Sequence, residues 1–224
     1  MKVAIMQPTF FPWVGYFSLI NEADMFVFLD DVEYSHQSWQ SRNHFEISGS
    51  IKWISLPIES SSKNLIKNIK IKNVERFIHK IERSLKQSYT KCAREAISDD
   101  FFTILKSQKI QFLSEFNIFV IKYFSKYLGL QTEFINSSVL NIEGNKSDKV
   151  NGILKALGAT TYVCSPGSRE YMIEYGLNNF YCPIDFYDYR SSIDVTDNKR
   201  LGVNLSIYHT IRHFSKEEIL NAIQ

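Results

Sequence analysis

The sequence predicts an α/β protein with a mainly parallel sheet of Rossmann-like type. Short apolar runs at residues 3–6 and 25–29 show no polar alternation, which is typical of strands that are buried on both faces. A loop and a short helix at residues 16–21 separate them, and a strand–helix–strand unit joins parallel neighbours. The same alternation of strands and helices returns after residue 131.

The segment after the first unit predicts a hairpin and one further strand. Residues 33–43 have no clear period and are expected to form a loop. Apolar residues at 45–47 and 51–56 flank Gly49, which predicts a hairpin that ends at Pro57. Ile69 and Ile71 alternate with lysines at 70 and 72, which predicts a half-exposed strand with a solvated edge.

The middle of the chain predicts two long helices. The first covers residues 74–96 after a capping Asn73, and the second covers residues 100–128 and stops at Gly129. Because the second helix is apolar on most of its circumference, we expect a helical layer or subdomain inserted between two α/β parts. The expected division is 1–72, 73–130 and 131–224, and we expect the three parts to form one compact unit.

The last part predicts alternating strands and helices. We expect strands at 132–135, 160–164 and 180–186, and helices at 148–157, 169–175 and 215–222. Gly158 and Gly176 end two of these helices.

Composition narrows the class of protein. A hydrophobic share of 44% in 224 residues is enough for a core, and a net charge of +2 gives no reason to expect nucleic acid as a partner. The three cysteines have no metal-like spacing and are expected to be reduced core thiols. Charges interrupt the apolar segment 101–130, and the run after Lys2 is cut at Gln7, so we expect no membrane span or secretory signal and a cytoplasmic protein.

Polar residues follow the first two predicted strands directly. Parallel strands end at one edge of a sheet, where ligands bind in open α/β sheets, so Gln7 and the Asp30–Asp31 pair are candidates for one site. One of the two carboxylates could act as a general base, or both could be strand-end turn residues or helix caps. The Gln7 amide could bind a ligand or the loop backbone.

Aromatic and cationic residues nearby add candidate ligand contacts. Phe10, Phe11 and Trp13 could stack on a base or a sugar, or pack against the following helix. Arg42 and Asn43, with Gln37 and Trp39 before them, could bind a pyrophosphate, although a surface ion pair is the commoner role of one arginine.

A second turn, Ser165-Pro166-Gly167-Ser168, lies between a strand and a helix. Its backbone N–H groups favour an anion and its glycine permits close approach, or else it is a tight turn with Ser168 as the helix cap. His209 and His213 are four residues apart and share a face if that segment is helical. A histidine pair alone does not define a metal site, so the sequence predicts none.

Five segments resemble the WbqC-like family. They are VAIMQPTFFPWVGYFSLI and FVFLDDVEY near the start, then WQSRN, WISLP and, from Ala159, ATTYVCSPGSREYM. Members are encoded among genes for bacterial surface polysaccharides, notably O-antigen. The resemblance implies modification of a nucleotide-linked amino sugar by N-acyl or N-aminoacyl transfer, for example of glycine. It implies an activated acyl or aminoacyl donor, with an aminoacyl-tRNA as the one nucleic-acid partner considered, and it identifies no cofactor.

The chain also departs from that family. LSIYHTIRH stands where a pattern like LSIIDLLFN is expected, so His209 occupies the place of an aspartate and joins Asp30 and Asp31 as a candidate catalytic residue. A fainter resemblance links PWVGYFSLI to nucleotidylyl transferases of the HIGH type, with Trp13 and Tyr16 in place of both histidines. Adenylyl transfer is therefore not expected, and a non-catalytic component that binds a nucleotide sugar, a glycan or a protein remains an alternative.

Overall fold

A five-stranded parallel sheet forms the centre of the protein. The structure is a computed structural model, and it describes residues 1–59, 63–89, 98–144, 146–189 and 205–223. The sheet has the order β5-β2-β1-β6-β7, and every neighbouring pair is parallel. The strands are β1 (Lys2–Met6), β2 (Met25–Phe28), β5 (Glu133–Asn136), β6 (Thr161–Cys164) and β7 (Ile184–Phe186). The predicted α/β class is confirmed, whereas its Rossmann-like detail stays a prediction.

The central strand β1 is apolar from Val3 to Met6 because both of its faces are covered there. Val3 lies opposite Met25 of β2 and Tyr162 of β6 in register. Successive strand residues point to opposite faces, and accordingly Ala4 belongs to one hydrophobic core while Val3 and Ile5 belong to another. This is why the first apolar run of the sequence shows no alternation.

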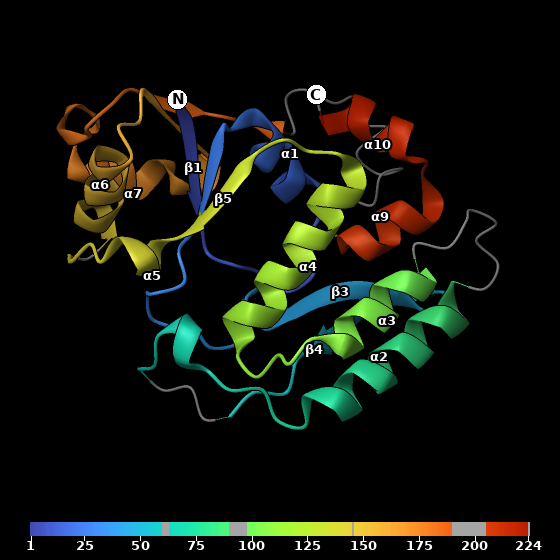
Figure 1. Cartoon of the computed structure of the whole chain (residues 1–224). Coiled ribbons are helices and arrows are strands. Elements are labelled where there is room, and N and C mark those ends of the chain that lie inside the picture. The colour runs from blue at the N-terminus through green and yellow to red at the C-terminus, as the bar shows by residue number, and fades with distance from the viewer. Residues whose placement is uncertain (60–62, 90–97, 145, 190–204, 224) are drawn as a thin grey trace.

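Helices cover both faces of the sheet (Figure 1). On one face, α6 (Lys146–Ala156) and α7 (Arg169–Tyr175) pack over the smaller core. On the other face, α1 (Val14–Glu22), α4 (Leu113–Leu128) and α10 (Lys216–Ile223) pack over the larger core. The short helix α5 (Ser137–Leu140) follows β5 directly.

A second layer lies beyond the larger core. It contains the antiparallel hairpin of β3 (Arg42–Ile47) and β4 (Ser50–Ser55), together with α2 (Val74–Ser88), α3 (Ser98–Ser107) and α9 (Ile207–His213). Helix α2 packs against α3 and against β3. The larger core takes residues from all three predicted parts of the chain, and the division into those parts stays a prediction.

The prediction of one helix over residues 100–128 is wrong, because the chain breaks between α3 and α4. The Glu115 carboxylate accepts hydrogen bonds from the backbone N–H groups of Gln111 (2.9 Å) and Phe112 (3.0 Å), which starts a new helix. The break also lets the Gln111 carbonyl accept a hydrogen bond from the Ile71 N–H at 2.9 Å.

The predicted strand around Ile69 and Ile71 is present only as isolated bridges. Ile71 bridges Ile58, and Lys70 bridges Phe112. The expected alternation is nevertheless observed, because both isoleucines are buried and Lys70 is exposed. The pattern therefore gave the correct faces for a segment with too few partners to form a strand.

Other boundaries differ by a few residues. The predicted strand 180–186 is limited to β7, because residues 177–179 form a 3₁₀ turn (Leu177–Asn179). Two more such turns are at Ile66–Asn68 and Pro166–Ser168. Cys164 and Cys182 are buried free thiols as expected, and Cys92 lies outside the described residues. None of the helices that the structure describes combines the length and the apolar character that a membrane crossing requires.

The start of α4 gives a first test. We expect Glu115→Ala to lower the free energy of unfolding by about 1 kcal/mol, because two backbone N–H groups lose their acceptor. Urea denaturation measures this change. Glu143→Ala, at an exposed loop position, is the matched control and should leave the midpoint unchanged.

Candidate functional site

Two cavities adjoin at the carboxyl edge of the sheet. The chain leaves β1 toward β2 on one side and later returns to β6 on the other, which opens a crevice where ligands bind in sheets of this kind. The first cavity, here called the Gln7 cavity, has a volume of about 600 Å³. The second, the Trp13 cavity, has a volume of about 380 Å³, and Met6 at the end of β1 lines both.

The Gln7 cavity is lined by apolar strand ends and by polar loop side chains. Its described lining is Ile5, Met6, Gln7, Thr9, Leu29, Ser38, Trp39, Gln40, Lys146, Val150, Tyr162 and Ser168. The Gln7 Oε1 accepts a hydrogen bond from the Gln40 Nε2 at 2.6 Å, and Gln40 is almost fully buried. The sequence analysis did not single out Gln40, although it lies within the WQSRN segment that resembles the family.

Two further groups in the Gln7 cavity suit a polar ligand. The Thr9 hydroxyl is buried and has no hydrogen-bond partner among the described residues. Buried hydroxyls in native proteins nearly always have a hydrogen-bond partner, so a polar group of a ligand would be a suitable partner for the Thr9 hydroxyl. Lys146, the first residue of α6, supplies the one cation in the described lining of this cavity.

The Trp13 cavity depends on the close approach of a ring to a glycine. A Cβ atom at Gly15 would lie 2.3 Å from the Trp13 ring, so only glycine lets the ring lie over the start of α1. The buried Tyr16 donates a hydrogen bond from its hydroxyl to the Gln7 carbonyl at 3.0 Å, and burial holds the pKa of Tyr16 well above its usual value. The described lining is Met6, Trp13, Gly15, Tyr16, Leu19, Ser165, Pro166, Gly167, Tyr187, Asp188 and Tyr189.

Asp188 is the one carboxylate in the described linings of the two cavities. It is exposed and comes two residues after β7, so it reaches the same edge as the ends of β1 and β6. The sequence analysis missed it, although its position just after a predicted strand was a usable signal.

The loop after β1 is anchored in the larger core. Phe10 and Phe11 have no exposed surface, and their ring centroids lie 5.0 Å apart among other core rings. Asn43 is buried, and its amide donates hydrogen bonds to the carbonyls of Phe10 (3.2 Å) and Phe11 (2.7 Å). The Asn117 amide holds the Pro8 carbonyl at 3.0 Å. We therefore assign Phe10, Phe11 and Asn43 to the support of the site and not to its surface.

Asp30 holds two strand ends together. Its carboxylate accepts hydrogen bonds from the Asn136 amide (2.9 Å) and from the backbone N–H (3.0 Å) and hydroxyl (2.9 Å) of Ser138. Only 2% of the residue is exposed, and it lies at the N-terminus of α5. Asp30 thus accepts a hydrogen bond from the first turn of α5, whose N-cap position is Asn136.

The Asp31 carboxylate also has an ion-pair partner and a hydrogen-bond donor. It forms an ion pair with the Lys149 ammonium at 2.8 Å and accepts a hydrogen bond from the Ser137 hydroxyl. The side chains of Asp31 and Lys149 are only 11% and 8% exposed. Neither Asp30 nor Asp31 is among the described residues that line the two cavities. A catalytic role for them stays a prediction.

The predicted anion-binding residues differ in whether they line one of the two cavities. Ser165 and Gly167 line the Trp13 cavity and Ser168 lines the Gln7 cavity, so this turn contacts both. Gln37 is exposed in the loop at a φ of +54°, and Arg42 stacks over the Trp53 ring at 4.3 Å. Neither Gln37 nor Arg42 is among the described lining residues.

A third cavity is a basic groove between β4 and α2, with a volume of about 720 Å³. Four cationic residues and no carboxylate stand in its described lining, which is Ile47, Lys52, Trp53, Ile54, Ser55, Pro57, Lys72, Asn73, Arg76, Phe77, Lys80, Ile81 and Ser84. Trp53 contacts Trp39 at 5.2 Å between ring centroids, and Trp39 lines the Gln7 cavity. The sequence analysis missed this groove because its cations come from separate elements.

His209 lies apart from the crevice. It is on α9, buried, and absent from the described linings of the two sheet-edge cavities. Burial, and then the neighbouring His213, lower the pKa of His209 to about 4. Its predicted catalytic role is untested.

These features define an α/β protein with two adjoining cavities at the carboxyl edge of its parallel sheet. The profile of the WbqC-like protein family matches residues 7–219, and the chain belongs to that family. It is 28% identical over 191 residues to a Mycobacterium tuberculosis (strain ATCC 25618 / H37Rv) protein named "Uncharacterized protein Rv1507c", which covers 84% of this chain and 82% of the relative. No solved structure matches the chain. Membership of the family points to a role in polysaccharide-related biosynthesis.

The loop anchor gives a second test. We expect Asn43→Ala to lower the free energy of unfolding by about 2–3 kcal/mol, because two buried carbonyls lose their donor. Thermal or urea unfolding measures the effect. Asn68→Ala, at an exposed position, is the control. Equal stability of the two variants would contradict the assignment of Asn43 to the support of the loop.

Proposed function

We propose that the protein transfers an acyl or aminoacyl group, for example glycyl, to the amino group of a nucleotide-linked amino sugar for surface polysaccharide such as O-antigen. The observation that carries this proposal is the pair of adjoining cavities at the sheet edge. Their volumes of about 600 and 380 Å³ fall in the range of sites for small molecules.

The Gln7 cavity suits the nucleotide-linked sugar. Gln7 and Thr9 supply hydrogen-bonding groups for sugar hydroxyls, and Lys146 supplies a positive charge for the diphosphate. The Trp39 ring is half exposed at the rim and can stack on a base or a sugar face.

The Trp13 cavity suits the reacting amino group. The amine nitrogen attacks the carbonyl carbon of a thioester or ester donor, so a C–N bond forms and the C–S or C–O bond to the carrier breaks. The nitrogen gives up a proton to a base, and the carrier leaves as a thiol or an alcohol. Asp188 lines this cavity and is our candidate for the base.

The basic groove suits the carrier of the donor. Lys52, Lys72, Arg76 and Lys80 would attract phosphate groups, and Trp53 offers a ring for stacking. Coenzyme A thioesters and aminoacyl-tRNAs share this phosphate chemistry. The contact between Trp53 and Trp39 places the groove beside the Gln7 cavity, and Met6 lines both that cavity and the Trp13 cavity. The carrier would therefore bind in the groove, and its acyl end would have to reach past Trp39 to the amine in the Trp13 cavity.

The proposed base gives a third test. We expect Asp188→Asn to lower kcat by at least about a hundredfold, in the range for loss of a general base, with little change in KM for the sugar nucleotide. The assay follows transfer of labelled glycine to dTDP- or UDP-linked amino sugars.

Asp185→Asn is the matched control, because Asp185 is an exposed carboxylate on β7 that is not among the described lining residues. Asp31→Asn is assayed in parallel. Full activity of Asp188→Asn with loss of activity in a folded Asp31→Asn would move the base to Asp31.

The groove gives a fourth test. We expect Lys80→Glu to raise KM for the donor by about tenfold or more while KM for the sugar nucleotide stays constant, because charge reversal costs over 1 kcal/mol at a phosphate contact. Lys155→Glu, on α6, is the control. Parallel assays with glycyl-coenzyme A and glycyl-tRNA identify the carrier, and an unchanged donor KM would remove the groove from the proposal.

A non-catalytic binding role is the second candidate. The contacts of Asp30 and Asp31 favour it, since both carboxylates predicted as bases already have partners. A thermal-shift series with dTDP- and UDP-amino sugars separates the two candidates. A rise in Tm without turnover for any donor supports binding alone, whereas turnover establishes the enzyme.

A further inference from the structure

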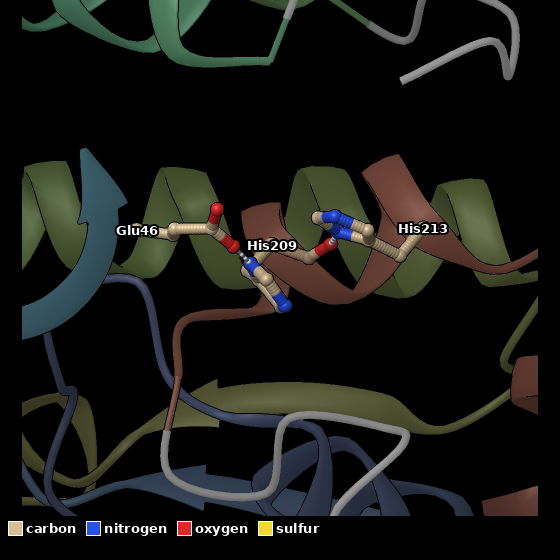
Figure 2. Close-up of side chains that lie close together, drawn as sticks. All are labelled: Glu46, His209 and His213. Carbon is tan, nitrogen blue, oxygen red and sulfur yellow. Dashed lines mark hydrogen bonds and ion pairs between the residues drawn. The ribbon is translucent and has the colours of Figure 1, made fainter. Parts of the chain in front are cut away.

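Three potential metal ligands from distant parts of the sequence converge beside the hairpin. Figure 2 shows Glu46 of β3 with its carboxylate directed toward His209 of α9, and His213 one turn further along that helix. The backbone N–H of Ser206 donates to the His44 carbonyl at 3.1 Å, which fixes the start of α9 against β3.

The spacing of these groups suits a shared ion. The His209 Nδ1 lies 3.5 Å from the Glu46 Oε2, and one ligand atom from each of the three residues falls within 4.8 Å of the others. A direct charge-assisted hydrogen bond would be about 2.7–2.9 Å long. Ligands at about 2.0–2.1 Å from a tetrahedral zinc ion are about 3.3 Å apart, which is close to the distance observed between His209 and Glu46.

His213 already has the support that metal-bound histidines have. Its Nδ1 lies 2.9 Å from the His209 carbonyl oxygen. Because a carbonyl only accepts, the hydrogen of the neutral ring is on Nδ1, and Nε2 is the nitrogen that carries the lone pair. A histidine whose second nitrogen is bound in this way is oriented for a metal.

The surroundings of His209 also hold it in place. The Tyr89 hydroxyl lies 3.1 Å from the same His209 Nδ1, so a metal bound at Nδ1 would replace this hydroxyl as the partner of that nitrogen. Arg212 donates a hydrogen bond to the Tyr89 carbonyl at 3.0 Å. Glu46 is only half-buried and His213 is exposed, so an ion can reach the three groups from solvent.

We propose that Glu46, His209 and His213 bind a divalent transition-metal ion, and zinc in particular. Two imidazoles and one carboxylate suit zinc, whereas calcium and magnesium prefer oxygen ligands. Three ligands from the described residues leave a fourth position for water or another ligand. None of the three lines a cavity described above, so this site is separate from the proposed reaction and does not depend on it.

The test is zinc binding by the whole protein after treatment with a chelator. Titration calorimetry and metal analysis should show about one zinc ion per chain, and zinc should raise Tm. His213→Ala changes an exposed side chain and should lower the affinity for zinc by more than about tenfold, as should Glu46→Gln. His79→Ala, on the exposed face of α2, is the control and should bind zinc normally.

Cobalt binding gives an independent reading of the same site. Cobalt in place of zinc should give the visible absorption of a tetrahedral ion, and this absorption should disappear in His213→Ala. Zinc binding that is equal in the wild type, His213→Ala and Glu46→Gln would overturn the proposal. No zinc binding by the wild type, with Glu46→Gln changing only the stability of the metal-free protein, would also overturn the proposal and leave Glu46 and His209 as a structural contact.

Discussion

The candidate site depends on the burial of the loop that follows β1. Phe10 and Phe11 are completely buried in the larger core, and Phe11 adopts a φ of +43°, which a bulky residue tolerates only when its surroundings fix it. The Asn43 amide satisfies the carbonyls of both residues inside that core. With the middle of the loop fixed, its two ends place Gln7 in one cavity and Trp13 in the other. The aromatic residues that suggested ligand stacking therefore act first as an anchor.

Two carboxylates, those of Asp30 and Asp31, support the same sheet edge next to the end of β2. Asp30 joins the end of β2 to the start of α5, and Asp31 pairs with Lys149 of α6. Ion pairs with little exposure cost desolvation, and removing one partner leaves an uncompensated charge, so such groups fix geometry more than they add stability. In the proposed reaction, the base is therefore sought among carboxylates that line a cavity. Among the described residues, Asp188 meets this condition.

The β3–β4 hairpin connects the features outside the sheet. Trp53 of β4 lines the basic groove and contacts Trp39 at the Gln7 cavity, while Glu46 of β3 faces the histidines of α9. The hairpin was predictable from Gly49 and its flanking apolar residues. The sequence did not predict that this hairpin borders both the basic groove and the cluster of Glu46, His209 and His213. The other sides of the groove and of the cluster come from α2 and α9, which lie far along the chain.

By itself, the sequence determined the features that depend on local pattern. The unbroken apolar runs of β1 and β2, with the alternating strands and helices after residue 131, predicted a mainly parallel sheet. The loops after the predicted strands marked its carboxyl edge, where Gln7, Trp13 and Ser165 line cavities. The tertiary structure decided what depends on long-range contacts. Long-range contacts ended a predicted helix before Glu115 and gave Asp30 and Asp31 hydrogen-bonding and ion-pair partners. They also brought Asp188 to the sheet edge and placed Glu46 beside His209. Spacing along a chain records the period of one element, whereas a site is formed by elements that only packing brings together.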